Sequence, residues 1–346
     1  MRRLFVVIAI SLFAFVGIVN AQSTDLSGLN GNIDPSSIST LDDFQGYLNA
    51  GNTVDLALNP KYPQPNQNVT ATLTSYSYDL NGATITWYIN GKEVTAGKAI
   101  KSVTFTTGNL GTATTVKAII AVGGSIQEKT ITVNPADITL LWQANTYTPP
   151  FYKGKALNSY QSVLTYVAVP QLYKNGQLVN PKNLVYTWSK NGTVLGDASG
   201  LGQQTFTLAG DVILRPSIIT VEVSDTAGTL STKRSIEVSA GSPLALFYED
   251  SPTLGILFNK SLSNMKSLKL PEINLTAIPF FFSASIKQSS ALSFIWQMNG
   301  SKMNITDPNA VFRLPQDTSG QASVSVQVRN QTKFLQGADN SLLIAF

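Results

Sequence analysis

The chain of 346 residues contains no cysteine and no histidine. Without cysteine there is no disulfide and no thiol nucleophile, and without histidine there is no serine–histidine pair. The commonest zinc ligands are missing for the same reason. Charge is also low, with a formal net charge of +4. Because no dense cluster of lysine and arginine occurs, we expect no nucleic-acid partner. Because the chain can form no disulfide, its fold must be stabilised by apolar cores alone.

The N-terminus has the features of a secretory signal. Arg2 and Arg3 precede an apolar run over residues 4–19, and small residues at Val19 and Ala21 suit a signal peptidase. We expect a signal peptide over residues 1–21. The run is short beside the roughly 20 residues that span a bilayer, so cleavage is favoured over the alternative, an uncleaved N-terminal membrane anchor. No later segment is apolar enough to span a membrane. We therefore expect an exported protein, and the lack of cysteine suits bacterial export.

Residues 22–52 are rich in serine, asparagine, glycine and aspartate, which predicts a flexible N-terminal segment. Thr40 could cap a short helix in it, with Asp43 closing the capping box. This stretch could dock on a partner, but a linker with one turn of helix is the preferred interpretation.

One strand-and-turn pattern, a tryptophan followed three residues later by Asn-Gly, occurs three times: Trp87-Tyr88-Ile89-Asn90-Gly91, Trp188-Ser189-Lys190-Asn191-Gly192 and Trp296-Gln297-Met298-Asn299-Gly300. Asn-Gly is the strongest short signal for a β-hairpin, because a type I′ turn needs positive φ at both central residues. Alternation with period two puts each tryptophan on the buried face of its strand. A two-residue turn also fixes the register, which predicts the cross-strand pairs Trp87–Val94, Trp188–Leu195 and Trp296–Met303.

The three hairpins predict an all-β chain of three tandem sandwiches. We expect domains over residues 53–135, 136–240 and 241–346, the first with seven short strands. The last two look like copies of one module. Their matching segments are 141–142 with 246–247, 167–170 with 276–279, and 219–223 with 324–328. A repeat of this length is a self-contained sandwich and not a solenoid unit.

The strand-turn segments, with the Val-x-Val-x-Val strands that follow them, resemble bacterial Ig-like and PKD-like domains. The resemblance covers the chain from about Thr53 to its end, and it extends in layout to uncharacterised exported proteins of small-genome candidate bacteria. It implies a β-sandwich fold and a place at the cell surface as a spacer or adhesive unit. Two family features are missing: the acidic Gly-Asp-Gly element after the tryptophan, and the cysteine pair of antibody domains. The resemblance thus says little about a ligand.

Acidic residues offer weak candidates for chemistry. Glu249-Asp250 could ligate calcium, but such a site needs six to eight oxygens, so a solvated pair is preferred. A glycosidase would need two carboxylates on either side of a sugar, and the acids available are Glu222, Glu249, Asp250 and Asp307. The segment 108–111 is rich in glycine but follows a sandwich strand, which argues against a phosphate loop.

Aromatic residues offer a second candidate, a groove. Its members would be Trp142, Tyr147, Phe151 and Tyr152 with the counterparts Phe247, Tyr248 and Phe258. Phe280-Phe281-Phe282 must also turn one ring to the opposite face of its strand, where it could bind a sugar. Packing between domains is the preferred interpretation. Several Asn-x-Ser/Thr sequons occur, including those at Asn68, Asn191, Asn274, Asn299 and Asn330, and chance and turn chemistry explain them.

We expect no catalytic residue, no metal and no cofactor, and hence a non-catalytic adhesion or spacer protein with a protein or glycan partner at the cell surface. The alternatives are an envelope assembly subunit that binds a protein partner, and a carbohydrate-binding accessory of a hydrolase, or a divergent hydrolase.

Overall fold

The computed structural model describes residues 54–210, 215–268, 272–313 and 319–346. The predicted signal peptide, the segment 22–52 and the helix cap at Thr40 lie outside the described residues. The described part is built of strands that pair almost entirely antiparallel, with short 3-10 helices at Pro181–Asn183 and Gly196–Ala198. It contains no helix with the length and hydropathy needed to cross a bilayer. The all-β prediction is thus confirmed.

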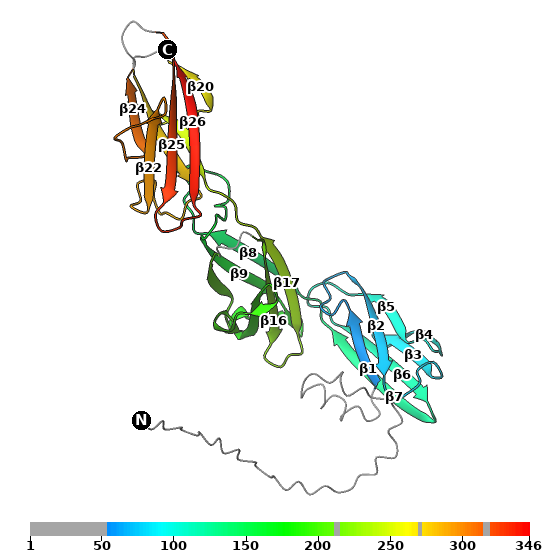
Figure 1. Ribbon diagram of the computed structural model, residues 1–346. Coiled ribbons are helices and arrows are strands. Elements are labelled where there is room, and N and C mark those ends of the chain that lie inside the picture. The colour runs from blue at the N-terminus through cyan, green and yellow to red at the C-terminus, as the bar shows by residue number, and fades with distance from the viewer. Residues whose placement is uncertain (1–53, 211–214, 269–271, 314–318) are drawn as a thin grey trace, which may run out of the picture. The chain divides into compact units, whose positions relative to one another are not determined.

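The first sandwich, drawn in blue and cyan in Figure 1, has the seven strands expected from the sequence. One sheet has the order β1-β2-β5 and the other the order β4-β3-β6-β7. The strands are β1 (Val54–Asn59), β2 (Asn68–Ser75), β3 (Thr84–Ile89), β4 (Lys92–Lys98), β5 (Ser102–Thr106), β6 (Thr114–Val122) and β7 (Ser125–Val133).

The second sandwich repeats this plan with additions. The sheet β15-β9-β8 faces the sheet β13-β12-β16-β17, to which β14 is added at β12, and β10-β11 form a separate hairpin. The strands are β8 (Asp137–Ala144), β9 (Val163–Gln171), β10 (Tyr173–Lys174), β11 (Gln177–Leu178), β12 (Leu184–Lys190), β13 (Thr193–Val194), β14 (Gly200–Leu201), β15 (Thr205–Ala209), β16 (Ser217–Asp225) and β17 (Ser231–Val238).

The third sandwich has the sheets β19-β18-β21-β24 and β20-β26-β25-β22-β23. β20 differs from the other strands because it pairs in parallel, with β26. The strands are β18 (Leu244–Ser251), β19 (Gly255–Ile256), β20 (Asn264–Ser267), β21 (Glu272–Phe280), β22 (Leu292–Met298), β23 (Ser301–Lys302), β24 (Asn309–Arg313), β25 (Gln321–Asn330) and β26 (Gly337–Ala345).

Each sandwich has its own apolar core, centred on one of the repeated tryptophans. Trp87, Trp188 and Trp296 are all 0% exposed and belong to three separate clusters of buried residues. Apolar residues two positions before each tryptophan are buried too, namely Ile85, Tyr186 and Phe294. Period-two alternation therefore identified the buried faces correctly.

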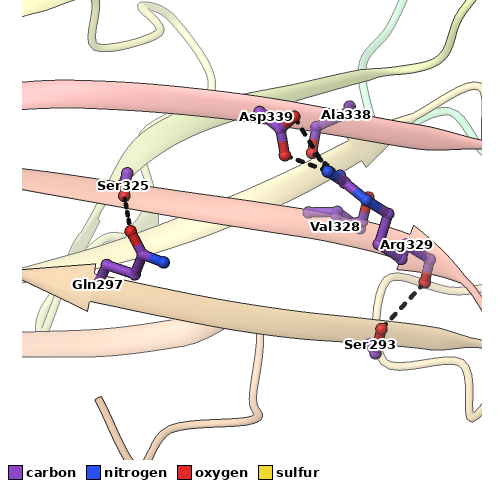
Figure 2. Close-up of polar contacts among 7 residues, drawn as sticks. All are labelled: Ser293, Gln297, Ser325, Val328, Arg329, Ala338 and Asp339. Atoms are coloured by element: carbon purple, nitrogen blue, oxygen red, sulfur yellow. Dashed lines mark hydrogen bonds and ion pairs between the residues drawn. The ribbon is translucent and has the colours of Figure 1, made fainter. Parts of the chain in front are cut away.

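Several polar side chains lie on the outer face of the third sandwich's five-stranded sheet (Figure 2). Arg329 of β25 reaches Asp339 of β26, with 2.7 Å between Nη1 and Oδ1, and also donates to the carbonyl of Ala338. Both side chains are exposed, and such pairs contribute little to stability. This face is solvated, while Val324, Val326 and Val328 of the same strand are fully buried.

The indole N–H of each repeated tryptophan finds the same kind of partner. Trp87 Nε1 donates to the Ile100 carbonyl at 2.8 Å, Trp188 Nε1 to that of Gln203 at 2.9 Å, and Trp296 Nε1 to that of Asp307 at 2.9 Å. Each carbonyl stands two residues before an edge strand of the opposite sheet, β5, β15 or β24. The tryptophan thus fills the core and also fixes where that edge strand begins.

The asparagine of each turn has a second function beyond its positive φ of 49–51°. Asn90 Oδ1 accepts from Thr115 N, and the Asn90 N–H donates to the carbonyl of the same residue. Asn191 makes the same pair of bonds with Ile218, and Asn299 with Ser323. Each turn is therefore tied to the neighbouring strand of its sheet.

The predicted registers hold in two hairpins of three. Leu195 N donates to the Trp188 carbonyl at 2.8 Å and Met303 N to that of Trp296 at 2.9 Å, and both partners pack on their cores. The pair Trp87–Val94 is wrong. A β-bulge between Trp87 and Tyr88 puts Trp87 opposite Thr95 and leaves Val94 48% exposed. A bulge adds one residue to one strand, which a count outward from the turn does not detect.

One predicted equivalence between the second and third sandwiches is also wrong. Phe247 pairs with Ala277, while Leu140 pairs with Ala168, the residue that the sequence matched to Ala277. The counterpart of Phe247 is therefore Leu140 and not Trp142. The match of 219–223 with 324–328 is right, because Trp188 faces Val221 just as Trp296 faces Val326.

We expect Trp188→Ala to lower the free energy of unfolding by about 3–5 kcal/mol, because it removes a fully buried indole and its hydrogen bond. Chemical denaturation of the chain, followed by circular dichroism, measures this loss. Trp142→Ala is the matched control, since Trp142 is only partly buried against the same core. Equal losses in the two variants would contradict the central position of Trp188.

Candidate functional site

Five of the seven aromatic residues proposed to line a groove meet at one place. Residues 145–162, the connection between β8 and β9, lie against β18 and β21 of the third sandwich. Phe151 packs on Phe258 with 6.4 Å between ring centroids, and Tyr152 packs on Phe280 and Phe281 at 5.8 Å each. The aromatic junction comprises Tyr147, Phe151, Tyr152, Tyr248, Phe258, Phe280 and Phe281.

The other two residues of the proposed groove lie elsewhere. Trp142 packs on the second core, with Lys155 Nζ 3.2 Å from its ring centroid, which is a cation–π contact. Burial lowers the pKa of Lys155. Phe247 is fully buried in the third core. The aromatic junction therefore fits the preferred interpretation, which was packing between domains. The structure does not bring all seven residues together to line one groove.

The interpretation of Phe280-Phe281-Phe282 as a source of an exposed sugar-binding ring is wrong. Phe280 and Phe281 are each 6% exposed and Phe282 is fully buried. Phe282 enters the third core, whereas the first two face the aromatic junction. Backbone hydrogen bonds also link the β8–β9 connection to the end of β21. Tyr147 N donates to the Phe282 carbonyl at 2.8 Å, and Phe281 N donates to the Tyr147 carbonyl at 2.7 Å.

Backbone strain is concentrated at the same junction. Phe151, Gln161 and Phe281 have φ values of 67°, 61° and 63°, in the left-handed region that bulky side chains rarely adopt. Such strain costs on the order of 1–3 kcal/mol per residue and persists only where surrounding contacts impose it. Phe151 is nonetheless 87% exposed as a residue. It is the one member of the junction whose ring is mostly available to a ligand.

A buried glutamine links the two sandwiches beside the aromatic junction. Gln336 is 1% exposed, and its Nε2 lies 2.7 Å from the Tyr160 carbonyl and 3.0 Å from Ser159 Oγ of the second sandwich. Within the third sandwich its Oε1 accepts from Ser283 N and Asn330 Nδ2. Gln336 could not be predicted from the sequence, because a single glutamine in a turn carries no periodicity or motif.

A smaller polar contact joins the first and second sandwiches. Burial raises the pKa of Tyr62 to about 12, and its hydrogen bond to Glu222 of β16 acts in the same direction. Ala136 N also donates to the Pro63 carbonyl at 3.3 Å. Gly111, from the glycine-rich segment 108–111, lies against the Tyr173 ring, which a Cβ atom would approach to 3.2 Å. Glu222, one of the four candidate acids, and the glycine-rich segment 108–111 thus take part in contacts between the first and second sandwiches.

The remaining acids have separate partners. Glu249 forms an ion pair with Lys266 at 2.7 Å, and both side chains are about one-third exposed. Asp250 Oδ2 is 3.4 Å from Thr276 Oγ1, and Asp307 Oδ1 accepts from Asn309 N at 3.0 Å. Within the described ranges there is no group of three or more histidine, cysteine, aspartate or glutamate residues placed to hold a metal ion.

Of the five sequon asparagines named above, four have structural roles. Asn191 and Asn299 tie their turns to the sheet, Asn68 Oδ1 accepts from Thr106 Oγ1, and Asn330 is 4% exposed and caps residues 332 and 333. Asn274 differs, because its buried Oδ1 has no hydrogen-bond partner.

Asp225 is a buried acid that was not predicted from the sequence. It is 7% exposed and accepts from the backbone of Thr229 and Leu230, from Thr229 Oγ1 and from Lys174 Nζ. Burial alone would raise the pKa of Asp225, but these hydrogen bonds outweigh it and lower the pKa to about 2. The residue closes the β16–β17 hairpin; the turn signal Asp-Thr-Ala-Gly could have identified it.

No protein-family model and no curated protein matches this sequence. Among solved structures, the chain is similar to the three N-terminal domains of the highly immunogenic outer capsid protein of bacteriophage RB49, at 13% identity over 84% of this chain and 98% of that one, with a TM-score of 0.27. It is similar to the central fibronectin-III array of RIM-binding protein at 12% identity, over 84% and 95%, with a TM-score of 0.29. A Bacteroides ovatus protein, SGBP-B of a mixed-linkage glucan utilization locus, matches at 11% identity, over 85% and 70%, with a TM-score of 0.20. These likenesses concern the fold alone.

Gln336→Ala should lower the free energy of unfolding by about 2 kcal/mol, because it leaves buried polar groups of both sandwiches unpaired. Denaturant titration measures the loss. Gln331→Ala, five residues away and exposed, is the matched control and should change stability by less than about 0.5 kcal/mol. A loss no larger than that of the control would contradict the role of Gln336.

Asp225 should make the free energy of unfolding depend on pH. Its pKa is about 2 in the folded chain and 3.8 in the reference state, so the stabilisation is present above pH 3.8 and is lost as the pH falls through 2. Unfolding titrations across this range should show a steeper decline for the wild type than for Asp225→Asn. Parallel curves would show that Asp225 is not the group responsible.

Proposed function

We propose that this chain is a non-catalytic, exported protein of the cell surface, of the bacterial Ig-like or PKD-like kind, that serves as a spacer or adhesion unit. The supporting observation is the way that its sandwiches are joined. Gln336 and the aromatic junction hold the third sandwich to the second, and Tyr62 with Glu222 connects the first to the second.

Joined sandwiches are what a spacer needs. Successive domains of one chain move relative to each other by default, unless their interface is apolar and well packed. Here aromatic rings, a two-way backbone contact at Tyr147 and a buried glutamine combine at a single junction. An interface of this kind would let the second and third sandwiches present a binding surface at a fixed orientation. The partner in this proposal is a protein or glycan at the cell surface.

A second candidate is a carbohydrate-binding accessory protein, which the exposed ring of Phe151 favours. An aromatic ring held open by a strained backbone can stack on the apolar face of a sugar. The envelope assembly alternative rests on residues 22–52, which lie outside the described residues.

Surface display is tested on intact cells that make the protein. Antibodies against residues 54–346 should bind these cells before lysis, and external protease should remove the signal. A variant lacking residues 1–21 is the control and should be detected only after lysis. Detection of the full-length chain only in lysed cells would refute the proposal.

Adhesion and carbohydrate binding are separated by a glycan array probed with the purified chain. Binding that is lost in Phe151→Ala but kept in Phe334→Ala, where the ring is 75% exposed, would support the accessory protein. Binding that is insensitive to both substitutions would exclude Phe151 as the sugar platform.

A further inference from the structure

A lysine and an asparagine carboxamide meet on the outer face of the third sandwich's four-stranded sheet. Lys287 lies in the connection between β21 and β22, and its Nζ is 3.5 Å from Oδ1 of Asn309, the first residue of β24. Thr276 of β21 stands directly opposite Asn309 and donates its hydroxyl to the same oxygen at 2.8 Å. Thr276 is fully buried, whereas Lys287 and Asn309 are partly exposed.

Two carboxylates complete the cluster. Asp250 Oδ2 is 3.4 Å from Thr276 Oγ1, and Asp307 Oδ1 accepts the backbone N–H of Asn309 at 3.0 Å. Both act on Lys287 electrostatically and favour its charged form, yet burial outweighs them and lowers the pKa of Lys287. A lowered pKa increases the neutral fraction of an amine, which is the nucleophilic form.

We propose that Lys287 and Asn309 join in an intramolecular isopeptide bond. Neutral Nζ attacks Cγ of Asn309, and the Thr276 hydroxyl stabilises the negative charge that develops on Oδ1. The bond from Cγ to Nδ2 breaks, and Asp250 carries the proton from Nζ to the leaving amide, which departs as ammonia. One amide bond forms and one breaks, so no oxidant, cofactor or energy source is consumed.

The fold by itself does not require these residues. The structural counterparts of Asp250, Thr276 and Asn309 in the second sandwich follow from the strand registers as Gln143, Val167 and Thr205. Ser102, the first residue of β5, takes the place of Asn309 in the first sandwich. The scaffold and its tryptophan are repeated, but the carboxylate and the carboxamide acyl donor at these positions occur in the third sandwich alone.

A neighbouring lysine provides the contrast. Lys266 Nζ also lies beside an acid, at 2.7 Å from Glu249 Oε2, and both side chains are about one-third exposed. Its recorded partner is a carboxylate, which is a poor acyl donor because it has no leaving group. Lys266 thus forms an ordinary ion pair, whereas Lys287 contacts a carboxamide that can release ammonia.

The test is mass spectrometry of the full chain after purification and tryptic digestion. We expect a branched peptide in which Lys287 is linked to Asn309, with the mass of one ammonia missing. Fragment mapping is needed because Asn-Gly turns and an N-terminal glutamine can also lose ammonia. Linear peptides that cover both residues in the folded wild type would overturn the proposal, as would a link to Asn274, the nearby asparagine with an unpaired oxygen.

Variants then assign the roles. Lys287→Arg and Asn309→Ala should abolish the branched peptide. Asp250→Ala keeps both reacting residues and should leave them unlinked, with circular dichroism confirming that the chain is folded. Lys266→Arg is the matched control and should keep the branched peptide. Complete linkage in Asp250→Ala would refute the role given to that carboxylate.

Discussion

One hydrogen bond, repeated in every sandwich, positions much of the rest of the structure. The indole N–H of the hairpin tryptophan crosses the core to a carbonyl two residues before an edge strand of the opposite sheet. The tryptophan is buried because alternation directs it inward, and burial would leave its N–H unpaired without this acceptor. The bond therefore couples the two sheets through the core. In the third sandwich the acceptor belongs to Asp307, so the same bond determines where Asn309 begins β24.

The junction between the second and third sandwiches obeys a different constraint. Its aromatic rings are contributed by a long connection and by the outer face of a sheet, so the packing requires the chain to turn sharply. Phe151 and Phe281 adopt positive φ for this reason, and Gln336 satisfies the polar groups that the packing buries. Strained backbone persists only where surrounding contacts impose it, and a buried amide is stable only where its polar atoms are hydrogen-bonded, so both features fit a closed interface.

The sequence predicted the features that depend on local pattern. Three Asn-Gly turns, the inward tryptophans and the strands around them follow from period and turn chemistry, and all are present. The bulge beside Trp87 was not predictable, because an extra residue leaves the alternation on either side unchanged. Gln336 and Lys287 were missed for another reason. Their partners are far away in the sequence, so no local pattern indicates their roles. Asp225 differs, because most of its partners lie in the turn that follows it.

The position of the proposed link also fits the mechanics of a sandwich. β24 is an edge strand that is held by β21 alone, through five residue pairs, and edge strands are the places where sheets fray or add foreign strands. Lys287 and Asn309 are 22 positions apart, and the segment between them contains β22 with Trp296. A covalent bond there would close a loop around the tryptophan hairpin and restrict the unfolded chain, as any cross-link does. It would fasten the edge strand at the residue where the tryptophan hydrogen bond already sets its start. The tryptophan hydrogen bond and the covalent link would then both act on the start of β24. In the described part of the chain, neither of the other two sandwiches has this combination.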